Sequence, residues 1–114
     1  MVFIKLQCRR MLLKMSSFKT IMASDLSQLI RQGKKLSVID VREPFEYQMG
    51  HIPGSKNMPL SNFELEALNK EEEHYLLCAT GARSLEAARV LATYGYKIIN
   101  VMGGTSAYNG PMKR

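Results

Sequence analysis

Short apolar runs of strand length alternate with helix-like runs along this chain, and that alternation constrains the fold more than any other feature. Three runs rich in Val, Ile, Leu and Tyr have the composition of buried strands, at residues 35–41, 74–78 and 97–102. Ser24 and Asp25 offer a helix start that Gly33 ends, and residues 84–94 form a helix that Gly95 ends. This order predicts one α/β domain, with a mostly parallel central sheet and helices on both faces.

Shorter signals predict further elements between these runs. Pro44 suits a first helical position and Gly50 a position just beyond a helix end, so a helix of about two turns is predicted between them. Ser61 and Glu64 form a capping box, which predicts a helix in residues 62–70. A brief strand is predicted near Asn57 and Met58, and one helical turn from Thr105.

Positive charge is concentrated at the N-terminus of this 114-residue chain, whose net charge is +6. Residues 1–24 hold five bases and no acid, whereas the chain from Asp25 onward holds eleven bases and ten acids. The folded body therefore lacks the basic stripe of a nucleic-acid-binding protein, and no nucleic-acid partner is expected. The sequence predicts a basic extension over residues 1–19 and a folded domain over residues 20–112.

The origin of the extension stays open between three interpretations. It is a flexible tail, or the product of an upstream start codon with Met11 or Met15 as the biological start, or a transit peptide, although such peptides are richer in serine and arginine. Its apolar runs are too short for a signal sequence or a membrane span, so no membrane partner is expected.

The chain has two cysteines, Cys8 and Cys78, which are too few for a four-thiolate zinc site. The two histidines, His51 and His74, are not spaced as metal ligands, and we expect neither a metal nor another cofactor. So few cysteines without a secretory signal fit a reducing compartment, so the expected location is the cytoplasm.

Cys78 ends a predicted strand and stands before the best predicted helix, where the loop of residues 79–83 joins the two. Ligands of open α/β sheets bind at the carboxyl ends of strands, and a helix N-terminus favours an anion there. A cysteine in that field is expected to be partly ionised. Gly81 allows the loop to curl so that its amides form an anion-binding nest, and Arg83 can hold an anionic substrate or brace the loop against a carboxylate.

A second interpretation is that Cys78 is a small, buried packing residue. The residues around it favour chemistry instead, because Ala79, Thr80 and Ala82 leave the loop mouth open and a glycine and an arginine accompany them. Packing alone requires none of these.

Two segments of the chain resemble the rhodanese-like domain family of sulfurtransferases. "VIDVREPFEYQMGHIPGSKNMPL" is similar to the family's D-V-R…E-[YF]-x-x-G-H-I-P-G-A segment, and "LLCATGARSLEAARVLATYGYKIINVMGGTSAYNG" is similar to its C-x-x-G-x-R-S loop, helix and glycine turn. The resemblance covers roughly residues 20–110. Two separate motifs in the right order make it specific.

The resemblance implies sulfur transfer through a persulfide. The Cys78 thiolate would take the sulfane sulfur of a donor such as thiosulfate and pass it to cyanide or a thiol, which can belong to a protein. Substrate would be bound by Ala79, Thr80, Gly81, Ala82, Arg83, Ser84 and Arg42. Asp40, His51, Gly103 and Gly104 would support the site structurally. The protein is expected to be a monomer or a weak homodimer.

Two other functions remain open from the sequence. A related phosphatase or arsenate reductase would carry its arginine six residues after the cysteine, at the position of Ser84, whereas this chain has Arg83. A catalytically weak binding or sulfur-relay module is the second alternative. Because Ala79, Thr80 and Ala82 carry no charge, thiosulfate is expected to bind weakly, and a persulfide or polysulfide is the preferred donor.

Overall fold

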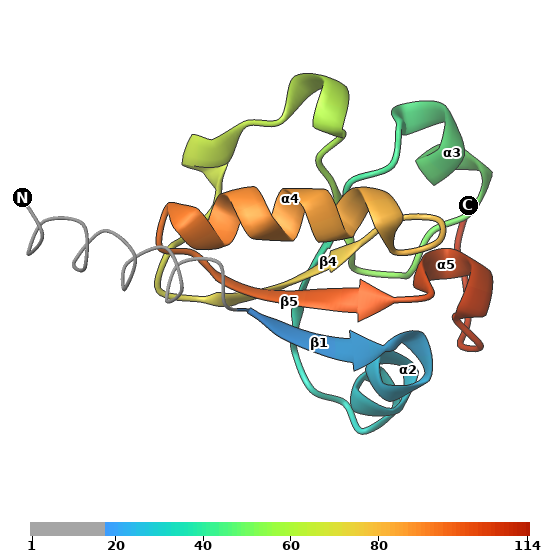
Figure 1. Ribbon diagram of the computed structural model, residues 1–114. Helices are drawn as coiled ribbons and strands as arrows, with labels where there is room; N and C mark the ends of the chain where they lie inside the picture. Colours follow the sequence, from blue (N-terminus) through green and yellow to red (C-terminus); the bar gives the residue numbers. More distant parts are fainter. Residues whose placement is uncertain (1–17) are drawn as a thin grey trace, which may run out of the picture.

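The computed structural model describes residues 18–114, which form a parallel sheet between two layers of helices (Figure 1). The sheet order is β1-β5-β4-β2-β3, and every pairing is parallel. The strands are β1 (Lys19–Met22), β2 (Ser37–Asp40), β3 (Lys56–Asn57), β4 (Glu73–Leu77) and β5 (Lys97–Met102). This arrangement confirms the predicted α/β class.

Within residues 18–114, four helices and two short 3₁₀ turns accompany the strands, and the last helix follows the last strand. They are α2 (Ala23–Arg31), α3 (Pro44–Met49), η1 (Leu60–Asn62), η2 (Leu65–Ala67), α4 (Ala82–Thr93) and α5 (Gly104–Ala107). Pro44 begins α3 as predicted, since its fixed φ suits a first helical position and its missing amide hydrogen costs nothing there. No helix within residues 18–114 is long and apolar enough to cross a membrane.

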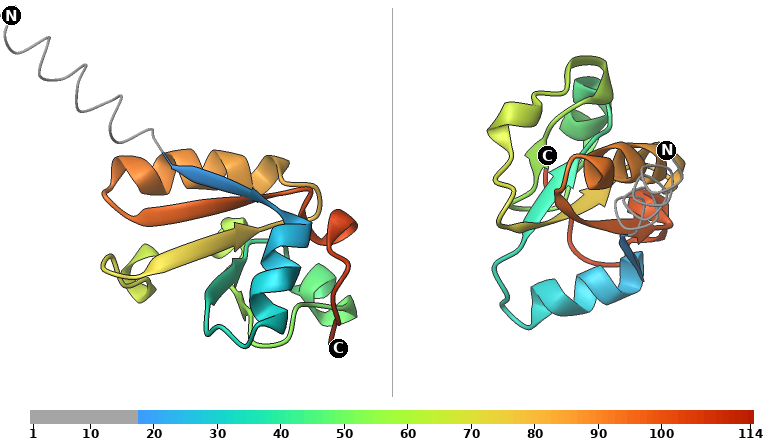
Figure 2. Two further views of the ribbon diagram at one scale, coloured as in Figure 1. Left: turned by 90° about the horizontal axis from the view of Figure 1, so that it is seen from below. Right: turned by 60° about the vertical axis from the view of Figure 1, so that its left-hand side comes forward.

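The two faces of the sheet carry two separate apolar cores. Along β4 successive side chains point to opposite faces, so Leu76 packs in a cluster with Ala88 and Leu91 of α4, while Leu77 packs in a cluster with Leu26 of α2. All five are buried. Figure 2 shows α4 and α2 on opposite sides of the sheet. The continuous apolar runs of the sequence are explained by this burial on both faces.

The predicted helix over residues 62–70 is wrong. Two 3₁₀ turns occupy this region, and the Ser61 hydroxyl donates to the Glu43 carboxylate, at 2.7 Å, instead of capping a helix. Phe63 and Leu65 pack against the core on the α4 side, and the Tyr96 hydroxyl donates to the Leu65 carbonyl. Tertiary contacts therefore hold this segment in an extended course that the local capping signal could not reveal.

The strand β1 was not predicted. It is a four-residue edge strand that pairs with β5, with Lys19 opposite Ile99 and Met22 opposite Met102. Residues 1–17 of the predicted extension lie outside the described residues.

The carboxyl ends of the strands meet at one edge of the sheet. In Figure 1 the arrows of β4 and β5 point toward the N-terminal end of α4, with α3 and α5 beside it. The two segments that resemble family motifs therefore meet at this edge, where open α/β sheets bind ligands.

Candidate active site

Cys78 follows the last residue of β4, and its sulfur lies inside the loop that leads into α4. The side chain is fully buried, as part of the core on the α4 face. The Gly81 amide donates to Cys78 Sγ at 3.0 Å, and the Ser84 amide donates to it at 3.4 Å. The loop therefore wraps the sulfur in backbone N–H groups, which is the nest predicted from the sequence.

These contacts favour the thiolate. Burial raises the pKa of the Cys78 thiol, but hydrogen bonds from the Ser84 hydroxyl and amide and from the amides of Gly81 and Thr80 outweigh it and lower the pKa below its ordinary value. A lowered pKa increases the fraction of nucleophilic thiolate at neutral pH.

Helix α5 supports the loop from the side opposite to the sulfur. The Thr105 amide donates to the Cys78 carbonyl at 2.8 Å, and the Ser106 amide donates to the Ala79 carbonyl at 2.9 Å. With its carbonyls satisfied from behind, the loop can direct its amides inward. Gly104 makes this approach possible, because a Cβ at this position would lie 2.7 Å from the Ala79 carbonyl carbon, and closer still to the Cys78 oxygen.

Gly81 meets a similar demand on the other side of the loop. It precedes α4 with φ of 101°, a left-handed conformation that favours glycine. A Cβ there would approach the Gly103 amide nitrogen at 3.0 Å. The glycines predicted to turn the backbone beside the site, Gly103 and Gly104, thus lie directly against the Cys78 loop.

Arg83 turns toward α3 and forms a two-pronged ion pair with Glu46, with N–O distances of 2.9 and 3.0 Å. Of the two roles that the sequence left open for Arg83, the structure thus shows the bracing of the loop against a carboxylate. Glu46, to which the sequence analysis assigned no role, is therefore a neighbour of the site. No local signal could have revealed a partner 37 residues away.

Asp40 and Arg42 form a buried ion pair at the end of β2. The Arg42 Nε and Nη2 atoms donate to both Asp40 oxygens at 2.9 to 3.2 Å, and Nη2 also donates to the Gly50 carbonyl. Asn57 ties the same turn by donating to the carbonyls of Asp40 and Arg42. Arg42 is buried, and its Nε and Nη2 atoms hold the turn together, whereas the substrate contact expected of it stays a prediction.

His51 is held by its neighbours. Its ring stacks on Tyr47 with centroids 3.8 Å apart, and Nδ1 lies 2.9 Å from the Tyr47 carbonyl. Its backbone pairs with Lys113 in an isolated antiparallel bridge. These contacts agree with the predicted structural role.

Asn100 is a site neighbour that the sequence analysis missed. It is buried on β5, and the Ser84 hydroxyl lies 2.6 Å from its Oδ1 atom. A hydroxyl carries one hydrogen, so Ser84 donates to one at a time of Asn100 Oδ1, the Gly81 carbonyl at 3.2 Å and the sulfur. A buried polar residue inside an apolar strand was the available signal.

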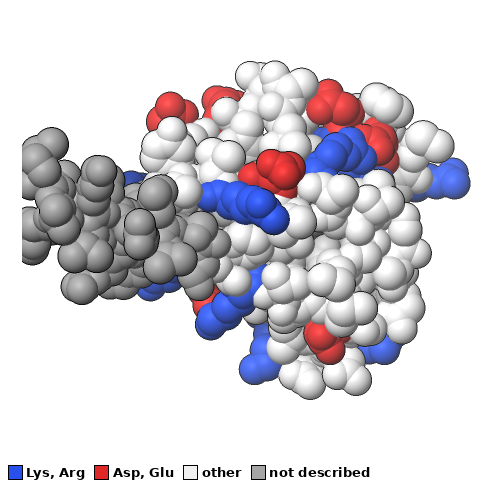
Figure 3. Space-filling model, viewed as in Figure 1, with Lys and Arg blue, Asp and Glu red and all other residues white. Residues whose placement is uncertain are grey.

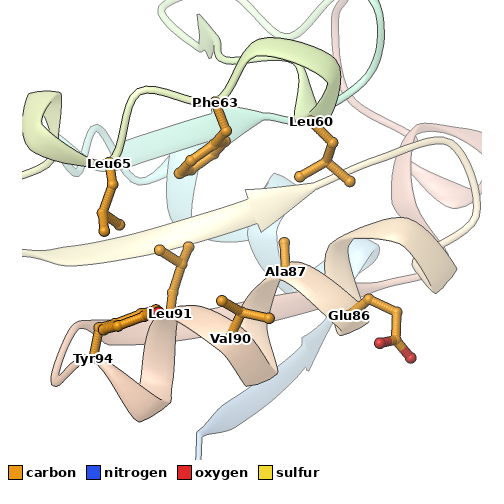
Figure 4. A pocket seen from close by; sticks show the side chains of 8 residues that line it. All are labelled: Leu60, Phe63, Leu65, Glu86, Ala87, Val90, Leu91 and Tyr94. Atoms are coloured by element: carbon orange, nitrogen blue, oxygen red, sulfur yellow. The ribbon is translucent and has the colours of Figure 1, made fainter.

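Two surface features lie apart from this loop. An apolar groove of about 390 Å³ separates α4 from the preceding 3₁₀ region, and in Figure 4 the side chains of the two walls face each other. It is lined by Leu60, Phe63, Leu65, Glu86, Ala87, Val90, Leu91 and Tyr94, and not by Cys78.

On the face shown in Figure 3, basic and acidic side chains are interspersed, and no patch of one sign dominates.

The comparisons with known proteins give the family. The model of the Rhodanese-like domain matches residues 22–110. The chain belongs to the rhodanese-like domain family. YtwF of Bacillus subtilis, which bears the name of a sulfurtransferase, is 33% identical over 97 residues, or 83% of this chain and 94% of that protein. YrkF of the same organism, named as a sulfur carrier protein, is 38% identical over 98 residues, but this chain matches only 53% of its length.

A solved rhodanese-like protein from Staphylococcus aureus has the same fold. It aligns with a TM-score of 0.78 at 31% identity, covering 84% of this chain and 97% of that one. Sulfurtransferase and sulfur-carrier relatives support rhodanese-type sulfur transfer in general, with a sulfur donor and an acceptor as partners.

Proposed function

We propose that the protein is a sulfurtransferase that carries a sulfane sulfur on Cys78 as a persulfide. The observation that carries this proposal is the cradle of backbone amides around Cys78 Sγ at the N-terminal end of α4. Such a cradle stabilises a negative sulfur before and after loading.

In the first half-reaction the Cys78 thiolate attacks the terminal sulfur of a donor persulfide R–S–SH. A new S–S bond forms to Cys78, the donor's S–S bond breaks, and its electron pair leaves with R–S⁻. Since Cys78 is fully buried, the loop has to open for the donor to reach it. No separate base is needed, because the thiolate is already favoured.

In the second half-reaction an acceptor thiol takes the outer sulfur. The acceptor's sulfur attacks, the Cys78 S–S bond breaks, and Cys78 returns to the thiolate as a new persulfide leaves. The two half-reactions share one site and one covalent intermediate, so ping-pong kinetics are expected.

Steady-state kinetics test this proposal. Initial rates measured against a small organic persulfide at several concentrations of an acceptor thiol should give parallel double-reciprocal lines, and Cys78→Ser should be inactive. Intersecting lines, or activity that survives Cys78→Ser, would overturn the covalent route. Hydrolysis of an aryl phosphate that depends on Cys78 would favour the phosphatase alternative instead.

A sulfur-relay module is the second candidate, and the relation to YrkF favours it. A relay would load Cys78 readily but pass its sulfur slowly to small thiols and rapidly to a protein thiol. Single-turnover transfer of sulfur from the preloaded protein to small thiols separates the enzyme from the relay module. An enzyme should transfer its sulfur to a small thiol at least as fast as it turns over, whereas a relay module should transfer it more slowly.

A further inference from the structure

The positive charge of the Cys78 loop, on Arg83, is neutralised by a neighbouring carboxylate. The loop of residues 78–84 and the two segments that contact it, residues 43–50 and 101–108, carry one base, Arg83, and two acids, Glu43 and Glu46. Arg42, just outside them, is paired with Asp40. With the thiolate included, these segments bear an excess of negative charge.

Glu46 is fixed in place to hold Arg83. It lies in the first turn of α3, where one of its carboxylate oxygens accepts the Glu43 amide at 3.0 Å as well as an Arg83 N–H. The Arg83 side chain is 41% exposed and that of Glu46 24%, so the pair lies at the rim of the site. The Arg83 hydrogen bond above all lowers the pKa of Glu46 to about 2, and the carboxylate stays charged at any pH at which the enzyme works.

Arg83 is also within electrostatic reach of the nucleophile. The Glu46 hydrogen bond is the main cause that raises the pKa of Arg83, and the charges of Cys78 and Glu43 act in the same direction. Arg83 is therefore the guanidinium that an anionic donor would meet at this mouth, but Glu46 already engages two of its five N–H groups and neutralises its charge.

We propose that Glu46 determines donor specificity by occupying Arg83, so that the site discriminates against dianionic sulfane donors and accepts persulfides of lower charge. The proposal rests on the sulfur-transfer function proposed above. With thiosulfate, the thiolate attacks the outer sulfur, the S–S bond to the sulfite sulfur breaks, and sulfite leaves with the electron pair. Two negative charges must then enter and leave past Glu43 and Glu46. An organic hydropersulfide without other charged groups carries at most one negative charge and meets weaker repulsion.

Glu46→Gln tests the proposal, because a glutamine keeps an oxygen for the Glu43 amide but neither attracts nor neutralises Arg83. We expect kcat/KM for thiosulfate to rise about tenfold and that for an organic persulfide without other charged groups to rise by no more than about threefold. Added salt should raise wild-type kcat/KM for thiosulfate by screening the repulsion, and should raise it less in Glu46→Gln.

Two further variants separate charge from shape. Glu46→Asp keeps the negative charge. The ratio of kcat/KM for thiosulfate to kcat/KM for the organic persulfide should therefore stay at its wild-type value, even where the loop packs less well. Glu73→Gln removes a carboxylate from the exposed ion pair with Lys19, at the other end of β4. It should leave kcat/KM for both donors unchanged.

An equal fall of kcat/KM for both donors in Glu46→Gln would overturn the proposal. It would show that Glu46 only braces the loop and does not affect the choice of donor. Unchanged thiosulfate kinetics would also overturn it. Failure of the proposed function is distinguishable from either result, since wild-type protein would then take up no sulfur on Cys78 from any donor.

Discussion

Replacing Gly104 by alanine adds one methyl group, and it should be among the substitutions of this size that most destabilise the protein. Gly104 has φ of 55°, and its backbone lies directly behind the Cys78 loop. The left-handed conformation alone costs an alanine about 1 kcal/mol. The added Cβ also needs space held by the Cys78–Ala79 peptide, so the two hydrogen bonds from Thr105 and Ser106 are strained, at about 1 kcal/mol each. The free energy of unfolding should therefore fall by about 3 kcal/mol.

Two other glycines provide graded controls. Gly95 also has a positive φ, of 87°, but a Cβ there meets no atom within 4 Å, so Gly95→Ala should cost about 1 kcal/mol. Gly50 has extended backbone and open space, and Gly50→Ala should be close to neutral. The three variants separate backbone strain from the close approach behind the active loop.

Urea unfolding followed by circular dichroism measures the series. With a denaturant slope of about 2 kcal/mol per M, the midpoint should fall by about 1.5 M for Gly104→Ala and about 0.5 M for Gly95→Ala. Sulfur uptake by Cys78 should also slow in Gly104→Ala alone. If Gly104→Ala and Gly95→Ala lose the same stability, the close packing of α5 on the loop does not exist in solution and the account of the cradle is wrong.

Three further predictions concern the charges and hydrogen bonds of the site. Ser84→Ala should slow sulfur loading of Cys78 about tenfold at neutral pH, because a hydrogen bond that lowers the pKa of the thiol is lost, and the deficit should shrink at high pH; a deficit independent of pH would contradict this. Asp40→Ala should lower the free energy of unfolding by about 3 kcal/mol in urea, since it leaves the Arg42 guanidinium buried without its partner; a loss below about 1 kcal/mol would count against that pair. The Arg83 hydrogen bond lowers the pKa of Glu46 from its ordinary 4.5 to about 2, so the pair's stabilisation is complete above about pH 4.5 and is lost as the pH falls toward 2. After solvent screening, the expected loss is about 1 kcal/mol, and Glu46→Gln should lack this part of the pH dependence.

The parts of the fold that the sequence predicted are those with a local physical signal. The run at residues 74–78 and the alanine-rich helix before Gly95 bury continuous faces, and their patterns follow directly from that burial. Cys78 was placed correctly at a strand end because strand, glycine loop and helix follow one another along the chain.

The missed parts depend on contacts between distant segments. The four residues of β1 become a strand only by pairing with β5, and the Ser61 hydroxyl serves Glu43 because the fold brings α3 beside η1. The pairs of Arg83 with Glu46 and of Ser84 with Asn100 arise in the same way. The sequence could therefore predict the position of Cys78 and its loop, but not the carboxylate and the amide beside them.

Intact-protein mass spectrometry after incubation with an organic persulfide tests the central claim most directly. The account predicts a mass gain of one sulfur atom on the wild-type protein, removed by a thiol reductant and absent in Cys78→Ser. A wild-type protein that gains no sulfur from an organic persulfide, a polysulfide or thiosulfate, or a Cys78→Ser variant that gains as much as wild type, would contradict it.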